Sequence, residues 1–407
     1  MRVGYLIPEF PGQTHIWMWR EIVHMRRWGV DVHLFSTRRP PDRDKARHDW
    51  ADDAAASCHY LWPIGPAQLA ADAAWALAHP GRLTSCIKLA RSLKVTNCDP
   101  IKLIPPAIRL ARLAKQKRLD HLHVHSCAGS SILAMHAKRL ADLPYSLTLN
   151  ANLEWWGGEM GRKFGESAFT VAITRWLYDQ VREQMPHLRE DQLILGRIGV
   201  DTDKWTPGDP PNNDTPQLII VGRLHESKGH AVLLDALAKV PGAALTIVGD
   251  GPERPAIEKQ IDSLGLTERV ALTGSVAEDQ IIGLMRGADL FVAPSHAEPL
   301  GVVYMEAMAM GVATIGTAAG GVAEIIDSGK DGLLVPPRDP DALASAIQQL
   351  IDDPARRRAI AQAGRESVVR NFDARIGAAT LYERLHGEPP ADIAHQRADT
   401  PTHPTAV

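Results

Sequence analysis

The stretch from Asp289 to Gly311 constrains the fold more than any other part of the chain. Its apolar run, Leu290–Ala293, predicts a buried parallel strand, and the proline-rich residues that follow predict a loop at the carboxyl end of that strand. A helix is expected from about Leu300 to Met310, because Gly311 is a natural helix stop. This order places the free N–H groups of a helix start at the edge where open α/β sheets bind ligands.

Two carboxylates frame this expected ligand edge. Glu298 stands just before the helix, and Glu306 lies in its second turn. Carboxylates beside an anion pocket would repel a bare phosphate. We therefore expect them to accept hydrogen bonds from hydroxyl groups attached to the phosphate, such as those of a sugar or a ribose.

The second half of the chain repeats the pattern of strand, loop and helix. The strand expected from Gln217 to Val221 leads into a loop that carries Arg223 and Lys228. Two cations and the N–H groups of a helix start would hold a diphosphate there. A later strand ends in a tight turn at Gly249 and Gly251, which leaves room for a nucleotide. The GxxxxGK[ST] pattern of a P-loop is absent.

The first half opens with the same architecture. A strand from Val3 to Ile7 is followed by a loop, a helix from about His15 to Trp28, and a second strand. The loop has no GxGxxG pattern, so a dinucleotide site is not expected there. Gly12 in this loop predicts a place where a substrate can approach the backbone closely.

Three histidines alternate along a later strand of the first half. They are His121, His123 and His125, and we expect His125 to reach the ligand because it lies at the carboxyl end of the strand. No carboxylate or cysteine stands at a matching spacing, so we predict no metal site. Asn150 follows the next strand. Trp155 and the tryptophan after it could form an acceptor platform or could be packed inside the domain.

Length and composition predict two globular domains. The chain has 407 residues, of which 45% are hydrophobic and 23% charged. The net charge of −3 hides an asymmetry, since residues 1–200 are net basic and residues 201–407 are net acidic. Four irregularly spaced cysteines predict free thiols in a reducing cytoplasm. We expect no signal peptide, no membrane span and no nucleic-acid partner.

One basic segment, residues 82–118, indicates a possible membrane contact. It carries ten Lys and Arg residues but only one acidic residue, Asp99, and leucines and isoleucines are interleaved with them. Such a segment suits an anionic membrane surface, at about 1 kcal/mol for each well-placed basic residue. The alternative is a pair of surface helices that are merely basic. The first interpretation predicts a cytoplasmic protein that sits peripherally at the inner face of the membrane.

The ordered motifs of the second half resemble those of glycosyltransferase family 4. They are GRL followed by SKG, then GDGP, the two glutamates of HAEPLGVVYMEAMAMG, GGVAE, and DGLLVPPRDPDALA. The likeness is strong over about residues 195–385. In the first half, FPGQTHIWMWREI and HVHSCAG are similar to enzymes of the colanic-acid and exopolysaccharide type.

This resemblance implies an α/β fold of the GT-B class, with two Rossmann-like, doubly wound domains that face each other across a cleft. We expect the following division of the chain: an acceptor-binding domain over residues 1–200, a linker over 201–216, a nucleotide-sugar-binding domain over 217–372, a helix over 373–387 that crosses back to the first domain, and a disordered tail over 388–407.

The resemblance also implies the function, which is retaining, metal-independent transfer of a sugar. The donor would be a UDP- or GDP-linked sugar, and the acceptor a lipid-linked molecule or a polysaccharide of the cell surface. The implied roles are as follows: Arg223 and Lys228 on the diphosphate, Glu298 on the donor sugar, Glu306 on the ribose, Leu300, Gly301, Gly249 and Gly251 around the donor, and Gly12, His125 and Asn150 on the sugar or acceptor side.

One residue departs from the family pattern. Many relatives have a histidine where this sequence has Asn150, and asparagine can bond a hydroxyl but cannot carry a proton. Two alternatives to a transferase therefore stay open: another GT-B enzyme, such as an epimerase, and a non-catalytic nucleotide-sugar binding protein.

Overall fold

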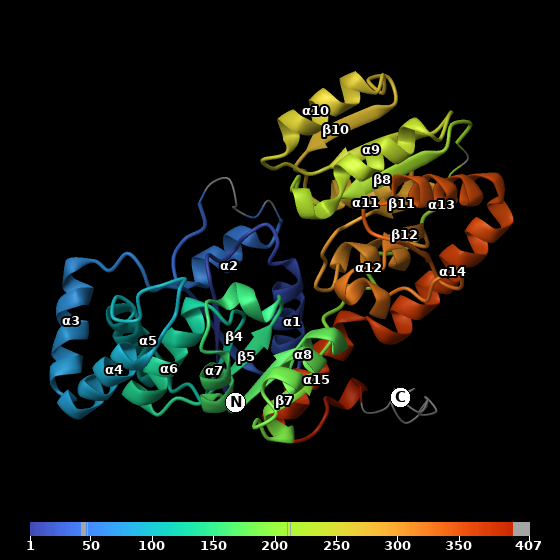
Figure 1. Ribbon diagram of the computed structural model, residues 1–407. Helices are drawn as coiled ribbons and strands as arrows, with labels where there is room; N and C mark the ends of the chain where they lie inside the picture. Colours follow the sequence, from blue (N-terminus) through green and yellow to red (C-terminus); the bar gives the residue numbers. More distant parts are fainter. Residues whose placement is uncertain (42–45, 47, 210, 212, 394–407) are drawn as a thin grey trace. The chain divides into compact units, whose positions relative to one another are not determined.

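The computed structural model describes residues 1–41, 46, 48–209, 211 and 213–393. Contacts divide the chain into two compact units. Unit 1 holds residues 1–197 and the chain from Arg375 onward, and unit 2 holds residues 198–374. Each unit is a parallel sheet with flanking helices (Figure 1).

The sheet of unit 1 has seven strands in the order β3-β2-β1-β4-β5-β6-β7, and all neighbouring pairs are parallel. The strands are β1 (Arg2–Ile7), β2 (Asp31–Ser36), β3 (His59–Tyr60), β4 (His121–Val124), β5 (Tyr145–Leu149), β6 (Phe169–Ala172) and β7 (Leu193–Leu195). The chain thus begins in the middle of the sheet and moves first to one edge and then to the other.

Some helices of unit 1 pack on the sheet and others pack on helices. The elements are α1 (Ile16–Arg27), α2 (Ala51–Ser57), α3 (Pro66–Leu77), α4 (Pro80–Ser92), α5 (Ile104–Lys117), α6 (Gly129–Ala141), η2 (Leu153–Trp156), α7 (Met160–Glu166), α8 (Arg175–Gln184), η3 (Glu190–Gln192) and α15 (Ala374–His386). Helix α6 packs on β4 and β5, α5 packs on α6, and α3 packs on α5 and α4. Helix α3 is therefore remote from the sheet.

Unit 2 has a six-stranded parallel sheet in the order β10-β9-β8-β11-β12-β13. The strands are β8 (Gln217–Val221), β9 (Ala244–Val248), β10 (Val270–Gly274), β11 (Leu290–Ala293), β12 (Ala313–Thr317) and β13 (Leu333–Val335). The helices are η4 (Glu226–Lys228), α9 (His230–Ala238), α10 (Arg254–Ser263), α11 (Glu278–Arg286), α12 (Val302–Ala309), η5 (Gly320–Glu324), α13 (Pro340–Asp352) and α14 (Pro354–Asn371).

The local predictions for the opening and central elements are confirmed. The expected strand at Leu290–Ala293 is β11, fully buried, and the helix after it is α12. The first helix and second strand of the chain are α1 and β2. These elements were predictable because apolar runs and glycine stops are local signals.

The chain passes from one unit to the other at two neighbouring points. Val200 N–H donates to the carbonyl of Phe372, and Ala374 N–H donates to the carbonyl of Val200, both at 2.9 Å. The Thr202 hydroxyl also donates to the carboxylate of Asp373. These bonds place residues 201–205 in unit 2, within the segment that we predicted to be a linker, and Trp205 is 1% exposed.

The end of the chain returns to unit 1. Leu381 of α15 is 2% exposed and belongs to the hydrophobic cluster of that unit. Of the predicted tail, residues 388–393 are placed, and Asp392 accepts a hydrogen bond from Trp28 Nε1 at 3.2 Å. The rest of the predicted tail, residues 394–407, lies outside the described residues.

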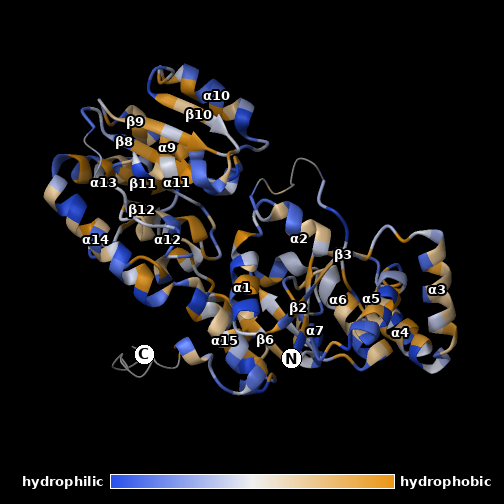
Figure 2. Cartoon of the chain, turned by 180° about the vertical axis from the view of Figure 1, so that it is seen from behind, coloured by the Kyte–Doolittle hydropathy of each residue, from blue (hydrophilic) through white to orange (hydrophobic). Residues whose placement is uncertain are grey.

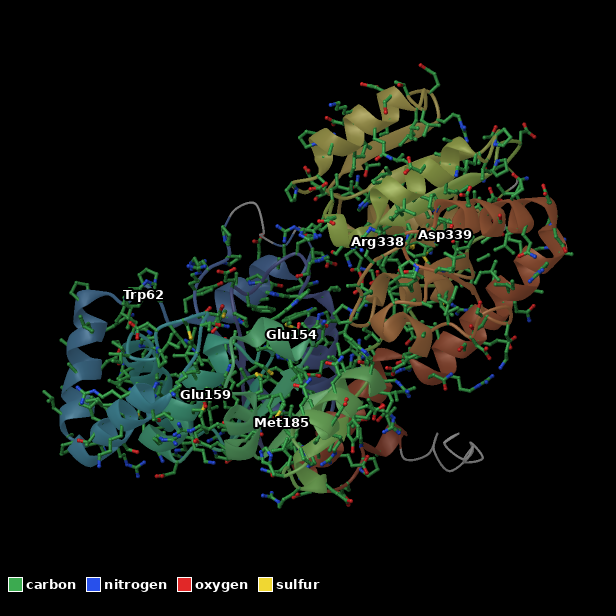
Figure 3. All side chains as sticks on the ribbon, in the orientation of Figure 1. Trp62, Glu154, Glu159, Met185, Arg338 and Asp339 are labelled. Carbon is green, nitrogen blue, oxygen red and sulfur yellow. The ribbon has the colours of Figure 1, made fainter. Side chains whose placement is uncertain are left out.

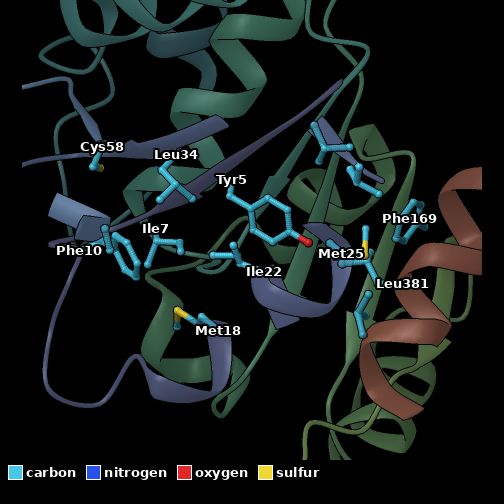
Figure 4. Packing of buried hydrophobic residues seen from close by; sticks show 14 residues of the cluster. Tyr5, Ile7, Phe10, Met18, Ile22, Met25, Leu34, Cys58, Phe169 and Leu381 are labelled. Atoms are coloured by element: carbon cyan, nitrogen blue, oxygen red, sulfur yellow. The ribbon is translucent and has the colours of Figure 1, made fainter. Parts of the chain in front are cut away.

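The core of unit 1 joins β1, α1 and β2. Figure 4 shows Tyr5 in the middle of this cluster, with Ile22 and Met25 of α1 nearby. The alternation of side chains along β1 sends Val3, Tyr5 and Ile7 toward α1. Helix α1 is therefore fixed on the sheet by burial of its apolar face.

The four cysteines are free thiols, as predicted. Cys58, Cys86 and Cys127 are buried, and burial raises the pKa of the Cys86 thiol to about 11. These side chains act as small apolar residues of the core. None of the described helices combines the length and the apolar composition that crossing a bilayer requires.

Truncation of Ile22 to alanine should destabilise unit 1 by about 2–5 kcal/mol, because its side chain is fully buried and the core cannot close the cavity completely. The matched control is Leu77→Ala, since Leu77 is 74% exposed and should change stability by less than about 0.5 kcal/mol. Scanning calorimetry of both variants provides the measurement. Equal losses of stability would contradict this description of the core.

Candidate active site

The candidate donor site lies where the strand order of unit 2 reverses. Strands β8 and β11 are neighbours in the sheet, but the chain leaves them toward opposite edges. The loops after these two strands therefore border a crevice at the carboxyl ends of the strands, the usual ligand site of doubly wound sheets. Residues 222–229 follow β8 and residues 294–301 follow β11.

The loops after β8 and β9 are in backbone contact. Leu224 N–H donates to the carbonyl of Asp250 at 3.0 Å, and Gly222 N–H donates to the carbonyl of Val248 at 2.9 Å. Gly249 has a φ of +138°, and a Cβ at this position would overlap the carbonyl oxygen of Gly222. Only glycine permits this approach. Gly251, the second glycine predicted here, lies equally close to the backbone of Leu224.

Lys228 and Glu298 meet across the two loops that border the reversal. The Lys228 Nζ donates to the Glu298 carboxylate, and the side chains are 30% and 10% exposed, respectively. The sequence suggested separate roles for these residues, a cation for phosphate and a carboxylate for sugar. The structure brings them together as an ion pair.

Helix α12 contributes the remaining predicted donor residues. Gly301 is its N-cap residue, with a φ of +87°, and Leu300 before it is 2% exposed. Glu306, in the second turn, is 9% exposed. Arg223 in the loop after β8 is exposed. Arg223 is thus open to solvent, whereas Leu300, Gly301 and Glu306 are almost covered.

Several contacts that shape the loop after β11 were not predicted. The Tyr304 hydroxyl donates to the carbonyl of Ala293, and the Thr317 hydroxyl donates to the carbonyl of Ser295. Gly321 N–H donates to the carbonyl of Glu298 at 2.9 Å. These bonds fix the backbone on both sides of Glu298. No sequence signal marks them, because hydroxyl groups inside strands and helices have many possible partners.

In unit 1, Gly12 lies in a tight turn after β1. Its N–H donates to Nδ1 of His15 at 2.9 Å, and His15 N–H donates back to the Gly12 carbonyl at 3.0 Å. Burial, with a smaller contribution from His125, lowers the pKa of His15 to about 4. Gly12 is itself buried, so its backbone is engaged by His15 in this structure.

His125 is placed differently from our expectation. It follows β4 directly, but it is 1% exposed, and its Nε2 lies 3.1 Å from Oε1 of Glu21 on α1. The ring is therefore closed off from solvent by α1 and does not reach toward a ligand. Its neighbour His123 is fully buried, and burial holds its pKa well below the ordinary value.

The turn after β5 carries Asn150 and two tryptophans. Asn150 Oδ1 is buried and has no hydrogen-bond partner among the described residues. Trp156 donates from Nε1 to the carbonyl of Ala151 at 3.0 Å, whereas Trp155 is 63% exposed. In this turn, which Glu154 marks in Figure 3, Trp155 is therefore exposed and Trp156 is half-buried, and the acceptor platform stays a prediction.

The comparisons with known proteins decide the family. The model of the family "Glycosyl transferases group 1" matches residues 201–367. The alpha-maltose-1-phosphate synthase of Mycolicibacterium smegmatis is 30% identical over 299 residues, which are 63% of this chain and 77% of that protein. The chain belongs to the group 1 glycosyl transferases. The enzyme prediction, a glycosyltransferase, is confirmed.

Two further similarities are informative. The GDP-mannose-dependent alpha-(1-6)-phosphatidylinositol monomannoside mannosyltransferase of Mycolicibacterium smegmatis is 34% identical to this glycosyltransferase over 210 residues, 46% of this chain and 55% of that protein. The crystal structure of HepE from Anabaena in complex with UDP matches with a TM-score of 0.73 at 18% identity, covering 95% of this chain and 100% of that one. The predicted α/β fold of the GT-B class is confirmed.

Adding a methyl group at Gly249 should disrupt the glycosyltransferase's loop after β9. We expect Gly249→Ala to lower the unfolding midpoint and to weaken nucleotide binding at least 10-fold, because the two loop backbones must separate. The matched control is Gly242→Ala. Gly242 also has a positive φ, of +78°, but a Cβ there meets nothing within 4 Å.

The control variant separates backbone strain from steric overlap. Gly242→Ala should cost about 1 kcal/mol of stability and leave nucleotide binding unchanged. Titration calorimetry with UDP and GDP, alongside thermal unfolding, measures both quantities. Nucleotide affinity that survived in Gly249→Ala would contradict the assignment of this turn to the donor site.

Proposed function

We propose that the protein is a retaining glycosyltransferase that moves a sugar from a nucleotide sugar to a lipid-linked or polysaccharide acceptor of the cell surface. The observation that carries the proposal is the convergence of Lys228 and Glu298 at the strand-order reversal of unit 2. Arg223, exposed in the same loop as Lys228, adds a second cation. This combination fits a negatively charged diphosphate that carries a hydroxyl-rich group.

The charge of the site suits departure of a nucleoside diphosphate. When the bond between the anomeric carbon and the phosphate oxygen breaks, the oxygen keeps the electron pair and negative charge grows on the phosphate. Cations that are already in place stabilise this charge without reorganisation. Lys228 and Arg223 would supply the positive charge, so the proposed transfer step needs no metal ion at the diphosphate.

Glu298 would exchange partners when the donor binds. In the free protein it neutralises Lys228. A diphosphate would take over that cation, and the Glu298 carboxylate would then accept a hydrogen bond from a sugar hydroxyl. Glu306 on α12 would accept the ribose hydroxyls. The acceptor hydroxyl would attack the anomeric carbon, and its proton would pass to the leaving phosphate, as the family resemblance implies.

Asn150 would serve the sugar side of the site. Its buried and unpartnered Oδ1 supports a role as a hydrogen-bond acceptor for a hydroxyl group. This role requires no proton transfer, so the absence of a histidine at this position is compatible with activity. UDP and GDP sugars are the donors that we propose to test first.

Lys228→Ala and Glu306→Ala should each weaken binding of the nucleotide sugar about 10- to 100-fold, since a hydrogen bond to a charged group contributes about 1.5–3 kcal/mol. The measurement is the thermal shift produced by UDP, GDP, dTDP, ADP and CMP sugars, with and without EDTA, relative to nucleotide-free protein in the same buffer. A shift that EDTA leaves unchanged is expected for one nucleotide class.

Lys239→Ala is the matched control for these variants. Lys239 is a half-exposed lysine of unit 2 that pairs with Asp341 on α13. Its loss should not change the nucleotide-dependent shift. If both site variants bound the donor like the parent protein, the proposed site would be wrong. Slow hydrolysis of the bound donor by the parent would distinguish a transferase from a binding protein.

We also propose that unit 1 contacts an anionic membrane surface, where a lipid-linked acceptor would be presented. Helix α3 supports this proposal, because Leu69 and Leu77 are 50% and 74% exposed. Trp62 before the helix, labelled in Figure 3, is 53% exposed. Figure 2 shows that hydrophobic residues dominate α3. Asp72, three residues after Leu69, is buried and pairs with Arg112 of α5.

The cations of residues 82–118 divide into two groups. Arg82 and Arg112 form ion pairs with Asp142 and Asp72, and Arg109 bonds Gln68. The exposed basic residues of this segment are Lys88, Arg91, Lys94, Lys102, Lys115 and Arg118. We therefore propose that this second group attracts the anionic surface, while the leucines of α3 supply an apolar contact. This location makes the protein cytoplasmic and peripheral.

Replacing Leu69 and Leu77 together by serine should reduce binding to vesicles of phosphatidylcholine and phosphatidylglycerol about 10-fold or more, because two exposed apolar contacts are lost. Co-sedimentation at low salt measures the bound fraction. Leu284→Ser, at a 36% exposed leucine of unit 2, should change nothing. Absence of binding by the parent protein at low salt would refute the membrane contact without affecting the donor site.

A further inference from the structure

Three side chains of types that bind metal ions converge in unit 1. They are Glu21 on α1, His123 on β4 and His125 just after β4, and one ligand atom from each lies within 4.8 Å of the others. Nε2 of His125 is 3.1 Å from Oε1 of Glu21, and Nε2 of His123 is 3.8 Å from the same oxygen. The cluster unites residues about 100 positions apart in the sequence.

The topology of the sheet explains this convergence. Residues 123 and 125 point to the same face, because side chains alternate along a strand. Strand β4 pairs with β1, and α1 is the helix that connects β1 to β2. Helix α1 therefore covers the face on which these histidines lie, and it places Glu21 above them.

The separations fit a tetrahedral metal ion. Zinc binds imidazole nitrogen and carboxylate oxygen at about 2.0–2.2 Å, so neighbouring ligand atoms lie roughly 3.3–3.5 Å apart around it. The two distances to Oε1 of Glu21 fall on either side of this value. Two histidines and one carboxylate are also a ligand set that zinc uses in proteins, with the fourth position open.

Neighbouring hydroxyl groups hold the ring of His123 in place. Ser146 Oγ lies 2.7 Å from Nδ1 of His123, and it also lies 2.8 Å from Nε2 of His121. Metal-binding histidines usually engage their second nitrogen in such a contact, which orients the ring. Thr148 Oγ1 lies 2.9 Å from Nε2 of His123, the same ring nitrogen that lies 3.8 Å from Glu21. A neutral oxygen therefore also stands beside the proposed metal position.

The carboxylate of Glu21 has no lysine or arginine partner among the ion pairs of the described residues. The Glu21 side chain is 13% exposed. Both imidazoles are fully buried. Tyr5 stands beside them, with ring centroids 5.4 and 5.6 Å from those of His123 and His125, and burial together with the Glu21 carboxylate holds the pKa of its hydroxyl well above the ordinary value.

We propose that Glu21, His123 and His125 bind one divalent transition-metal ion, for which zinc is the best fit, and that this ion fastens α1 to β4. The near-complete burial of the ligands assigns it a structural role in unit 1. The proposed sugar transfer itself remains independent of metal. Our expectation from the sequence, no metal at these histidines, rested on the lack of a nearby carboxylate, and α1 supplies that carboxylate only in the folded chain.

Metal analysis of the tag-free, full-length protein tests the proposal. The protein is dialysed against zinc, passed over a chelating resin to remove weakly held ions, and measured by mass spectrometry of the elements. We expect about one zinc ion per chain in the parent. The variants Glu21→Gln, His123→Asn and His125→Asn should retain at least about 10-fold less zinc, since each removes one of three ligands.

His136→Asn is the matched control. His136 is also a buried histidine of unit 1, but its Nε2 bonds the carbonyl of Pro100, away from the cluster. It should retain one zinc ion. Equal zinc retention by the parent and by the cluster variants would assign the metal to other residues and overturn the proposal.

Thermal unfolding gives a second readout that does not depend on activity. Zinc added to metal-free protein should raise the Tm of the parent and of His136→Asn, and it should leave the Tm of Glu21→Gln unchanged. If a cluster variant fails to fold, zinc retention and Tm of the parent protein alone test the proposal. A parent that retains no zinc and shows no zinc-dependent rise in Tm would overturn the proposal, and a proton shared by Glu21 and His125 would then balance the charge.

Discussion

The close approach of backbone segments at the carboxyl edge of the unit 2 sheet is the constraint on which the rest of the site depends. The position of Gly229 shows how this backbone approach places the side chains. A Cβ at this position would overlap the carbonyl oxygen of Pro294, so the loop after β8 can touch the loop after β11 only if residue 229 is glycine. Lys228 precedes this contact directly. The backbone approach thus brings its ammonium group to Glu298.

The ion pair of Lys228 and Glu298 links the fold to the chemistry. Each partner is largely covered by protein, so each would cost free energy if it lost the other without replacement. A diphosphate and a sugar hydroxyl are together such a replacement, because one offers negative charge and the other offers a hydrogen-bond donor. If the proposed donor site is correct, the free protein would hold both groups in a defined geometry before the donor binds.

Unit 1 uses its polar residues in a different way. Glu21, His123 and His125 lie beneath α1 and are almost inaccessible. Buried polar groups of this kind can stabilise a single arrangement when all of them are satisfied. The exposed hydrophobic side chains of the same unit include instead Trp155 and, on α3, Leu69 and Leu77. Interaction with large partners would thus take place on the outer helices and loops, while the polar interior holds the sheet and α1 together.

The sequence by itself determined the elements and the ligand edge of unit 2, because these follow from local signals. The apolar run at Leu290–Ala293 and the glycine stop of α12 could be read directly, and parallel strands necessarily bring their loops to one edge. Only the tertiary structure decided the pairing of Lys228 with Glu298, the enclosure of His125 by Glu21, and the exposure of α3. These depend on how distant segments pack, and neither periodicity nor spacing carries that information.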